Sequence, residues 1–208
     1  MTCAFSSASA NPAGGVEYIK YKDTGHRYPG VNNYLPYVIE HRKLSDPRDE
    51  TSAIKTTYAY SDTNFLGFDA PGVVWDENYN QDQLYKFTGD HYNYSTTVSH
   101  YLDGEVSHTV KHTFNRFHLM TEQVRDQAGC IQTTTMKYHD RPGSFADQDV
   151  RVQLPSKMTT TWTQTGTPNY RDISVDTVYD TDGNLVPQAT ILSTRKCSRG
   201  SPTTWVQS

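Results

Sequence analysis

The sequence has little of what marks several common protein classes. Only three of its 208 residues are cysteine: Cys3, Cys130 and Cys197. An odd number at such wide spacing forms neither a disulfide framework nor the C-x-x-C pattern of a metal site. No apolar run approaches the roughly 18 residues that a membrane-spanning helix needs. We therefore expect neither a disulfide-stapled domain nor a membrane span.

The N-terminal residues also lack a classical secretory signal. Met1 to Ser6 contains no basic segment, and no apolar core follows it. We expect the protein to be made in the cytoplasm and, if it leaves the cell, to use a specialised secretion system.

Basic residues are too few for a nucleic-acid partner. The net charge is −4 and the isoelectric point is near 6.0, whereas a nucleic-acid footprint needs clustered Lys and Arg. The one basic cluster, Arg195, Lys196 and Arg199, lies near the C-terminus and is typical of a disordered tail.

Catalytic motifs are missing as well. The chain has no G-x-S-x-G elbow, no phosphate-binding Walker loop, no G-x-G-x-x-G and no H-E-x-x-H. His108 and His112 would share one face of a strand but lie about 13 Å apart, too far to hold one metal ion. Cys130 is more typical of a small buried hydrophobe than of a nucleophile. We predict no catalytic, cofactor-binding or metal-binding residue.

What the chain does have is aromatic and β-branched residues. Hydrophobic residues make up only 35% and the mean hydropathy is −0.74, yet aromatics reach 12%, including 15 tyrosines. A disordered chain would be poor in aromatic and β-branched residues, whereas Tyr, Thr and Val favour strands. These numbers predict a folded all-β chain with a thin core.

The clearest structural pattern lies at residues 173–186. Apolar or aromatic residues at 173, 175 and 179 share one face of an extended strand. Asp180 begins an Asp-x-x-Gly turn in which Gly183 adopts a positive φ, and Leu185 starts a return strand. The pattern predicts a hairpin with its tip at 180–184.

Looser copies of this unit occur upstream. One runs from Phe114 to Leu119, with His118 where Gly183 stands; histidine is among the residues that tolerate that backbone conformation. Another runs from Val124 to Ile131, and a third opens at Tyr60-Ser61-Asp62 and ends irregularly at Leu66-Gly67-Phe68. Asp62, Asp126 and Asp180 would each open a turn and cap its backbone.

Aromatic, Asp, two free positions, Gly, polar, apolar is the pattern of the YD repeat of RHS proteins, and residues 57 to 186 resemble that family. The resemblance implies antiparallel hairpins wound into a continuous β-strip that closes as a hollow shell around a toxin domain, in bacterial competition systems or insecticidal toxin complexes. The chain would then be a non-catalytic piece of the shell wall. Its partners would be other YD-repeat segments or the enclosed toxin domain.

Two other hypotheses compete with the shell wall. Exposed aromatics can stack on sugars, so the chain could be a carbohydrate-binding module of a bacterial surface or secreted protein, using the residues Trp75, Tyr79, Tyr85, Tyr92, Tyr94, Tyr101 and Trp162. Packing of the tyrosines against cross-strand partners is the stronger explanation for most of these residues. An enzyme ranks last, because only scattered His and Asp support it.

Period-two alternation and turn residues divide the chain into three parts. We expect a disordered segment at 1–15, the YD-repeat-like β region at 16–192, and a tail at 193–208. Within the β region the expected strands are 16–21, 35–39, 54–60, 92–98, 106–114, 119–124, 131–138, 150–154, 158–162 and 173–178. Asp103-Gly104 is a strong two-residue hairpin signal, 42–50 reads as exposed loop, and 67–90 as a long insertion.

Overall fold

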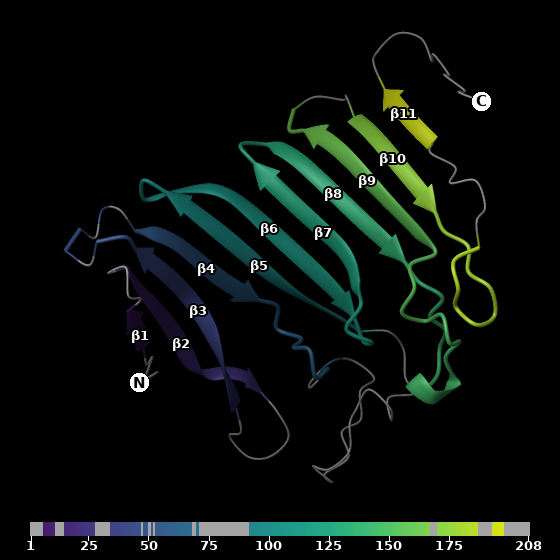
Figure 1. Cartoon of the computed structure of the whole chain (residues 1–208), viewed down its shortest axis with the longest axis horizontal. Helices are drawn as coiled ribbons and strands as arrows, with labels where there is room; N and C mark the ends of the chain where they lie inside the picture. The colour runs from purple at the N-terminus through teal and green to yellow at the C-terminus, as the bar shows by residue number, and fades with distance from the viewer. Residues whose placement is uncertain are drawn as a thin grey trace.

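The chain forms a single open sheet. The computed structural model describes residues 6–10, 15–27, 34–46, 48–49, 51, 53–67, 70, 92–166, 170–186 and 193–197. Within them, 11 strands follow one another in sequence order, each antiparallel to its neighbours (Figure 1). The all-β prediction is confirmed. None of the described helical segments is long and apolar enough to cross a membrane.

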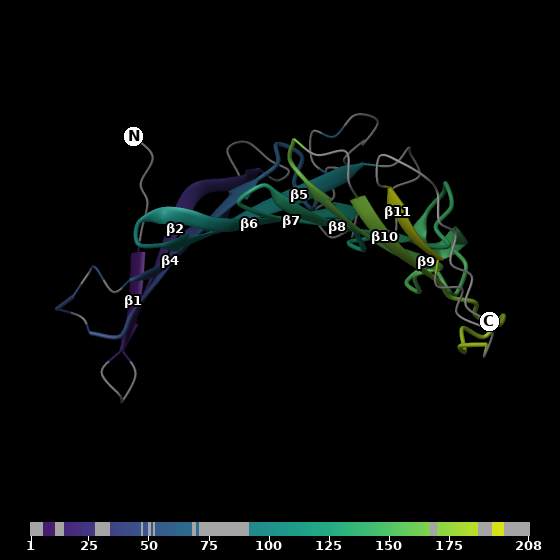
Figure 2. The ribbon, with the colours of Figure 1, turned by 90° about the horizontal axis from the view of Figure 1, so that it is seen from above.

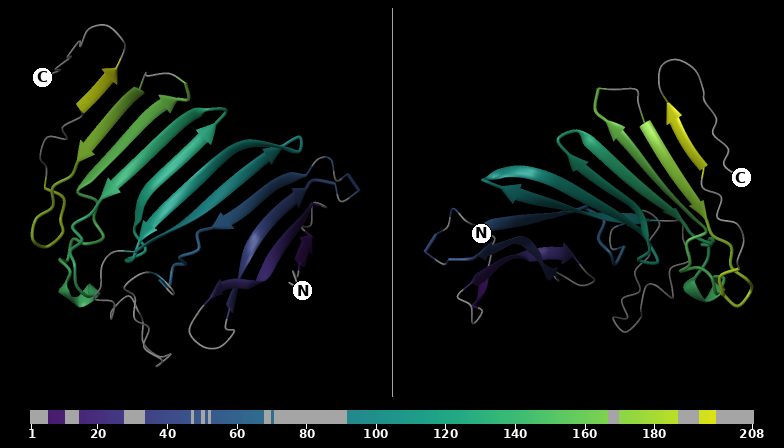
Figure 3. Two further views of the ribbon diagram at one scale, coloured as in Figure 1. Left: turned by 180° about the vertical axis from the view of Figure 1, so that it is seen from behind. Right: turned by 45° about the horizontal axis from the view of Figure 1, so that its top comes forward.

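The strands take up most of the described residues. They are β1 (Ser6–Ala10), β2 (Val16–Arg27), β3 (Tyr34–Leu44), β4 (Ile54–Tyr60), β5 (Asn93–Leu102), β6 (Glu105–Asn115), β7 (Met120–Gln127), β8 (Cys130–Lys137), β9 (Lys157–Gln164), β10 (Tyr170–Asp176) and β11 (Ser193–Cys197). A short 3₁₀ turn, η2 (Phe145–Asp147), lies between β8 and β9. Seen from above, the sheet bends into an arch from β1 to β11 (Figure 2), and these two strands end it on opposite sides (Figure 3).

Tight turns connect strands at one edge, which we call the hairpin edge. Asp103 and Gly104 join β5 to β6 with φ values of 50° and 83°, and Ala128 and Gly129 join β7 to β8 with 52° and 79°. Positive φ at both central residues defines the type I′ turn, whose twist matches that of paired strands. The hairpin tips predicted at 103–104 and 126–129 are confirmed.

Longer connections lie at the opposite edge, the loop edge, where β4, β6, β8 and β10 end. Most of the buried side chains of the described residues gather there rather than on the sheet. The buried hydrophobic residues are Leu44, Ala70, Tyr92, Phe117 and Val152, and the buried polar ones include Asn64, Asn115 and Arg116. The thin core that the composition predicts is therefore a row of packed loops beside a largely half-exposed sheet.

The two terminal segments differ from expectation. β1 lies within 1–15, expected to be disordered, and β11 lies within 193–208, expected to be tail. β1 pairs with β2 over Ser6 to Ala10, and β11 pairs with β10 over Ser193 to Cys197. Backbone pairing at a sheet edge needs no apolar alternation, so the small residues of β1 and the charged ones of β11 carried no period-two signal.

Two internal expectations are also corrected. β2 continues past Asp23-Thr24-Gly25 to Arg27, through a register irregularity between Lys22 and His26. β3 extends to Leu44, so the expected loop at 42–50 begins with strand. Pro36 lies in β3 outside the stretch that pairs with β4 (Glu40 to Lys43), where its missing N–H costs no bond to β4.

The expected strand at 150–154 is instead a run of turns. The Val152 and Leu154 N–H groups donate to the Asp149 and Arg151 carbonyls at 2.9 and 2.8 Å. The Asp149 side chain caps the Arg151 N–H at 2.9 Å, which favours the turn over extension. Of the insertion expected at 67–90, residues 68–69 and 71–90 lie outside the described part, Val73, Val74 and Trp75 with them.

Candidate functional site

One turn geometry recurs three times along the loop edge. The Asp180 Oδ1 accepts the N–H groups of Asp182 and Asn184 at 2.9 and 2.8 Å, and the Gly183 N–H donates to the Asp180 carbonyl at 3.1 Å. Gly183 has φ +84°. The turn predicted at 180–184 is confirmed. Its return strand is reduced to a bridge between Tyr179 and Leu185.

The second copy has asparagine and histidine in place of aspartate and glycine. The Asn115 Oδ1 accepts the N–H groups of Phe117 and Leu119 at 3.0 and 3.1 Å, and the His118 N–H donates to the Asn115 carbonyl at 2.9 Å. His118 has φ 61°, the left-handed conformation predicted from its alignment with Gly183. Its Nδ1 lies 3.0 Å from the Tyr94 hydroxyl, which holds the ring.

The third copy lies two residues later than expected. The Asn64 Oδ1 accepts the Leu66 N–H at 2.9 Å, the Gly67 N–H donates to the Asn64 carbonyl at 2.9 Å, and Gly67 has φ +68°. Asn64, not Asp62, therefore opens this turn. The shared spacing, Asx followed three residues later by Gly or His, was the signal that could have found it.

Asp126 does not open a turn of this kind. It pairs with Ile131 inside the β7–β8 ladder, and its Oδ1 accepts the Gly129 N–H at 3.0 Å from within the strand. The Asp-x-x-Gly spacing at 126–129 therefore marks a two-residue hairpin.

The loop-edge turns pack against one another. Arg116 is 2% exposed and donates to the Arg141 carbonyl at 2.9 Å, and its guanidinium lies 4.1 Å from the Phe117 ring centroid. Burial lowers the pKa of Arg116 from its ordinary value. Phe117 in turn meets Phe145 edge to face, with centroids 6.0 Å apart. The 115–118 turn is thereby anchored to the β8–β9 connection.

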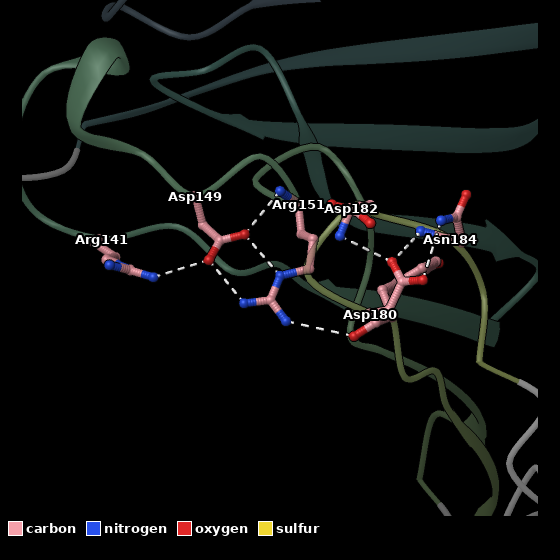
Figure 4. A network of polar contacts seen from close by, with 7 residues as sticks. Arg141, Asp149, Arg151, Asp180, Asp182 and Asn184 are labelled. Atoms are coloured by element: carbon pink, nitrogen blue, oxygen red, sulfur yellow. Dashed lines mark hydrogen bonds and ion pairs between the residues drawn. The ribbon is translucent and has the colours of Figure 1, made fainter.

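A carboxylate network ties that connection to the 180–184 turn (Figure 4). Asp149 accepts from Arg151 Nε and Nη2 at 2.7 Å each and from Arg141 Nη2 at 3.0 Å. Arg151 also donates to the Tyr179 carbonyl at 3.4 Å. These bonds hold the pKa of Asp149 well below its usual range, first through the Arg151 side chain. The pKa of Asp180 is also lowered, mainly by the hydrogen bond from the Asn184 side chain and then by bonds from backbone N–H groups.

Asp149 and Asp180 act as turn caps at this edge. Each accepts several hydrogen bonds, which lower its pKa and keep it ionised. A general acid needs the opposite shift, toward neutral pH. The bonds of Asp149 and Asp180 therefore hold neighbouring loops in place.

The histidines are dispersed over the sheet. His108 and His112 share one face of β6, as predicted, and each has its own partner: His108 stacks on His100 with centroids 4.4 Å apart, and His112 Nε2 lies 3.0 Å from Gln123 Nε2. Burial, the neighbouring His100 and Arg125 lower the pKa of His108. In the part of the chain that the structure describes, no three His, Cys, Asp or Glu side chains are grouped as metal ligands.

Three of the four described aromatic residues named as sugar-binding candidates contact other protein groups. Tyr92 is buried and donates to the Phe65 carbonyl at 3.2 Å. Tyr94 stacks on Phe114, and burial raises its pKa to about 12. The Lys55 Nζ lies over the Tyr101 ring, 4.6 Å from its centroid. Trp162 is 37% exposed on the sheet; Trp75, Tyr79 and Tyr85 lie outside the described residues.

Two further features escaped prediction. His26, Tyr37, Tyr60 and Phe65 form an aromatic cluster where β2 to β4 meet the loop edge, with Tyr37 and Tyr60 centroids 4.3 Å apart. The members of this cluster are far apart in the sequence, so no local sequence pattern indicated it. Cys130, expected to be buried, is exposed beside the hairpin edge, because it follows the turn directly.

Comparison with known proteins gave no match to a family model, a curated protein or a solved structure.

We predict that Gly183→Val lowers stability far more than Thr181→Val. Gly183 has φ +84°, where a β-branched residue is strained by about 1–3 kcal/mol, whereas Thr181 is exposed in the same turn. Thermal melts of the two variants measure the difference. Equal losses of melting temperature in the two variants would contradict the positive φ of Gly183 in this turn.

Asn115→Ala should destabilise the chain by about 1–3 kcal/mol, because it removes the acceptor of two backbone N–H groups at a buried turn. The matched control is Asn93→Ala. Asn93 is the register partner of Asn115 on β5 but is exposed, so its loss should be within about 0.5 kcal/mol of zero. Urea unfolding compares the two. The capping role is contradicted if Asn93→Ala costs as much.

Asp149→Asn should lower the melting temperature at pH 7, because the charged acceptor for two arginines is lost. The folded pKa of Asp149 is depressed below its ordinary 3.8, so its contribution is present above pH 3.8 and is lost as the pH falls below it. The gap in melting temperature between wild type and variant should therefore shrink below that pH. The control, Glu105→Gln on the exposed hairpin tip, should show no such gap; a constant Asp149 gap would refute the linkage.

Proposed function

We propose that this chain is a non-catalytic wall segment of a β-shell of the RHS/YD-repeat type, which encloses a toxin domain. The observation that carries the proposal is the sheet itself: 11 strands in sequence order, with unpaired outer edges at β1 and β11 within the described part. A strip of this kind can be lengthened at both ends without changing any existing pairing. A shell wall needs that property.

The recurring turns support the same proposal. The copies at 64–67, 115–118 and 180–183 all lie on the loop edge, where each follows an even-numbered strand. A repeating unit whose apolar face is only partly covered gains stability from its neighbours, as in repeat proteins generally. The largely half-exposed strands and the few buried side chains fit one stretch of a larger repeating sheet.

Carbohydrate binding is the second candidate, and one observation favours it. Trp162 is exposed on the sheet, with the Arg171 guanidinium 5.6 Å from its ring centroid. An exposed tryptophan ring can stack on the face of a sugar. It ranks second because the other described candidates, Tyr92, Tyr94 and Tyr101, contact protein groups instead.

We predict that the protein self-associates through its outer strands, because unpaired N–H and C=O rows template pairing with another chain. Light scattering should show a mass that rises with concentration, as soluble small oligomers. Ala8→Lys with Ala10→Lys on β1 should shift the protein toward monomer. The same two charges at the exposed hairpin tip, Leu102→Lys with Val106→Lys, should leave association unchanged.

A strictly monomeric wild type that melts cooperatively over a wide concentration range would contradict the wall-segment proposal. Such a protein would be a complete domain, and the binding module would then be the better account.

A further inference from the structure

The two faces of the sheet carry different chemistry. Residues paired across strands share a face, as do residues two apart on one strand. Following the register from β4 to β10 therefore assigns each side chain to one side. A row of register partners, one from each strand, is called a rung here. On one face a rung consists of Tyr58, Val98, Val110, Arg125, Gln132, Trp162 and Arg171. The other follows the rung Ala59, Thr97, Lys111, Val124, Thr133, Thr161 and Asp172.

We call the second side the ion-pair face, because charges of both signs meet on it. Lys157 lies 3.2 Å from Asp176, and the β3 residue Glu40 reaches Arg42 and Lys55 at 3.2 and 3.8 Å. Its remaining positions are largely threonine and serine, such as those paired between β8, β9 and β10. Mixed and paired charges beside hydroxyl groups suit a surface that stays in water.

The first side, the aromatic face, has the opposite character. From β4 to β10 it carries tyrosines, valines, methionines, three histidines, Phe114 and Trp162. On β4 to β10 every described Asp and Glu lies on the ion-pair face by its spacing along its own strand. Farther along the sheet, Glu17 of β2 and Lys43 of β3 bring one ion pair, at 3.1 Å, to the aromatic side. Arg125 and Arg171 are both exposed on it.

Neither arginine on the aromatic face has a carboxylate partner among the described residues. Arg125 contacts the Gln127 side chain at 3.5 Å, and Arg171 lies over the Trp162 ring. Trp162 and Met158 are 37% and 42% exposed beside them, and Ile54 is 64% exposed on β4. Exposed apolar side chains beside guanidinium groups that have no carboxylate partner are typical of a surface that another molecule covers.

The geometry points to an acidic polypeptide as that molecule. Resting on the wall-segment proposal, we infer that the aromatic face contacts a chain segment in which Asp or Glu alternates with apolar residues. Carboxylates would pair with Arg125 and Arg171, which accept them in bidentate fashion, and apolar residues would cover Trp162 and Met158. In a shell, this is the side that would face the enclosed chain. A nucleic acid fits less well, because Arg125 and Arg171 are the only fixed positive charges on this face among the described residues of β4 to β10.

Both arginines lie on one rung, three strands apart. At about 4.8 Å between neighbouring strands their backbones are about 14 Å apart. An extended peptide crossing the strands rises about 3.4 Å per residue, so residues four apart in the peptide match that interval. The intervening rung positions, Gln132 and Trp162, would meet the residues between them.

The test uses the full chain and a defined probe. The probe is a fluorescein-labelled 12-residue peptide in which every second residue is glutamate and the residues between are leucine or serine. Fluorescence anisotropy measures its binding, with the corresponding lysine peptide as the probe control. The variant Arg125→Gln with Arg171→Gln should weaken binding about tenfold, as expected for the loss of two exposed charge pairs. The matched control, Lys111→Gln with Lys137→Gln, removes the same charge from exposed positions on the ion-pair face and should change affinity less than twofold.

Equal weakening in both double variants would overturn the inference, because only net charge would then matter. Equal binding of the lysine peptide, or no binding of the glutamate peptide to the wild type, would overturn it as well. Thermal melts confirm that each variant is folded. A wild type that self-associates but ignores the glutamate peptide would refute this face assignment alone. A strictly monomeric wild type would refute the wall-segment proposal instead.

Discussion

The structure depends above all on the backbone hydrogen bonds between neighbouring strands. Few side chains of the described residues are fully buried, and those few lie mainly along the loop edge. Every strand from β1 to β11 is paired with the next, and β2 with β3 and β5 with β6 form the longest ladders, each with a register irregularity. Such a sheet gains its order from pairing and from cross-strand side-chain contacts, and it loses pairing partners only at its two outer strands.

The turns decide how those ladders register. Type I′ turns at 103–104 and 128–129 fix two hairpins at one edge, and side-chain caps at Asn64, Asn115 and Asp180 fix the other. Because register assigns every side chain to a face, the same turns separate the ion-pair face from the aromatic face. The separation of the two faces, on which the proposed inward side depends, thus follows from local turn chemistry.

Much of the middle of the sheet could be predicted from sequence. β4 matches its expected bounds, and β5 to β9 match within a few residues, because Thr, Tyr and Val alternate there and Asp or Gly marks the turns. The left-handed backbone of His118 followed from its alignment with Gly183. β1 and β11 could not be predicted, because pairing at a sheet edge requires no apolar alternation in the sequence. The turns at 150–154 could not be predicted either, because the Asp149 side chain caps the backbone there although two valines and a leucine favour a strand.

The surface chemistry was harder to see in advance. Arg125 and Arg171 are 46 positions apart in the sequence, and only the register across β7 to β10 places them on one rung. The same holds for the aromatic cluster around Tyr60, whose members come from three strands and a loop. A sequence pattern reports which face a residue takes relative to its own strand, and the pairing of strands must be known before faces can be compared.

The most direct test of the open-strip account is hydrogen–deuterium exchange of the backbone amides in dilute, monomeric protein. The account predicts the slowest exchange in β5 to β8 and progressively faster exchange toward β1 and β11, because each outer strand has one unpaired side. Protection of β1 and β11 equal to that of β6 and β7 would contradict it, since the outer strands would then be covered and the sheet closed.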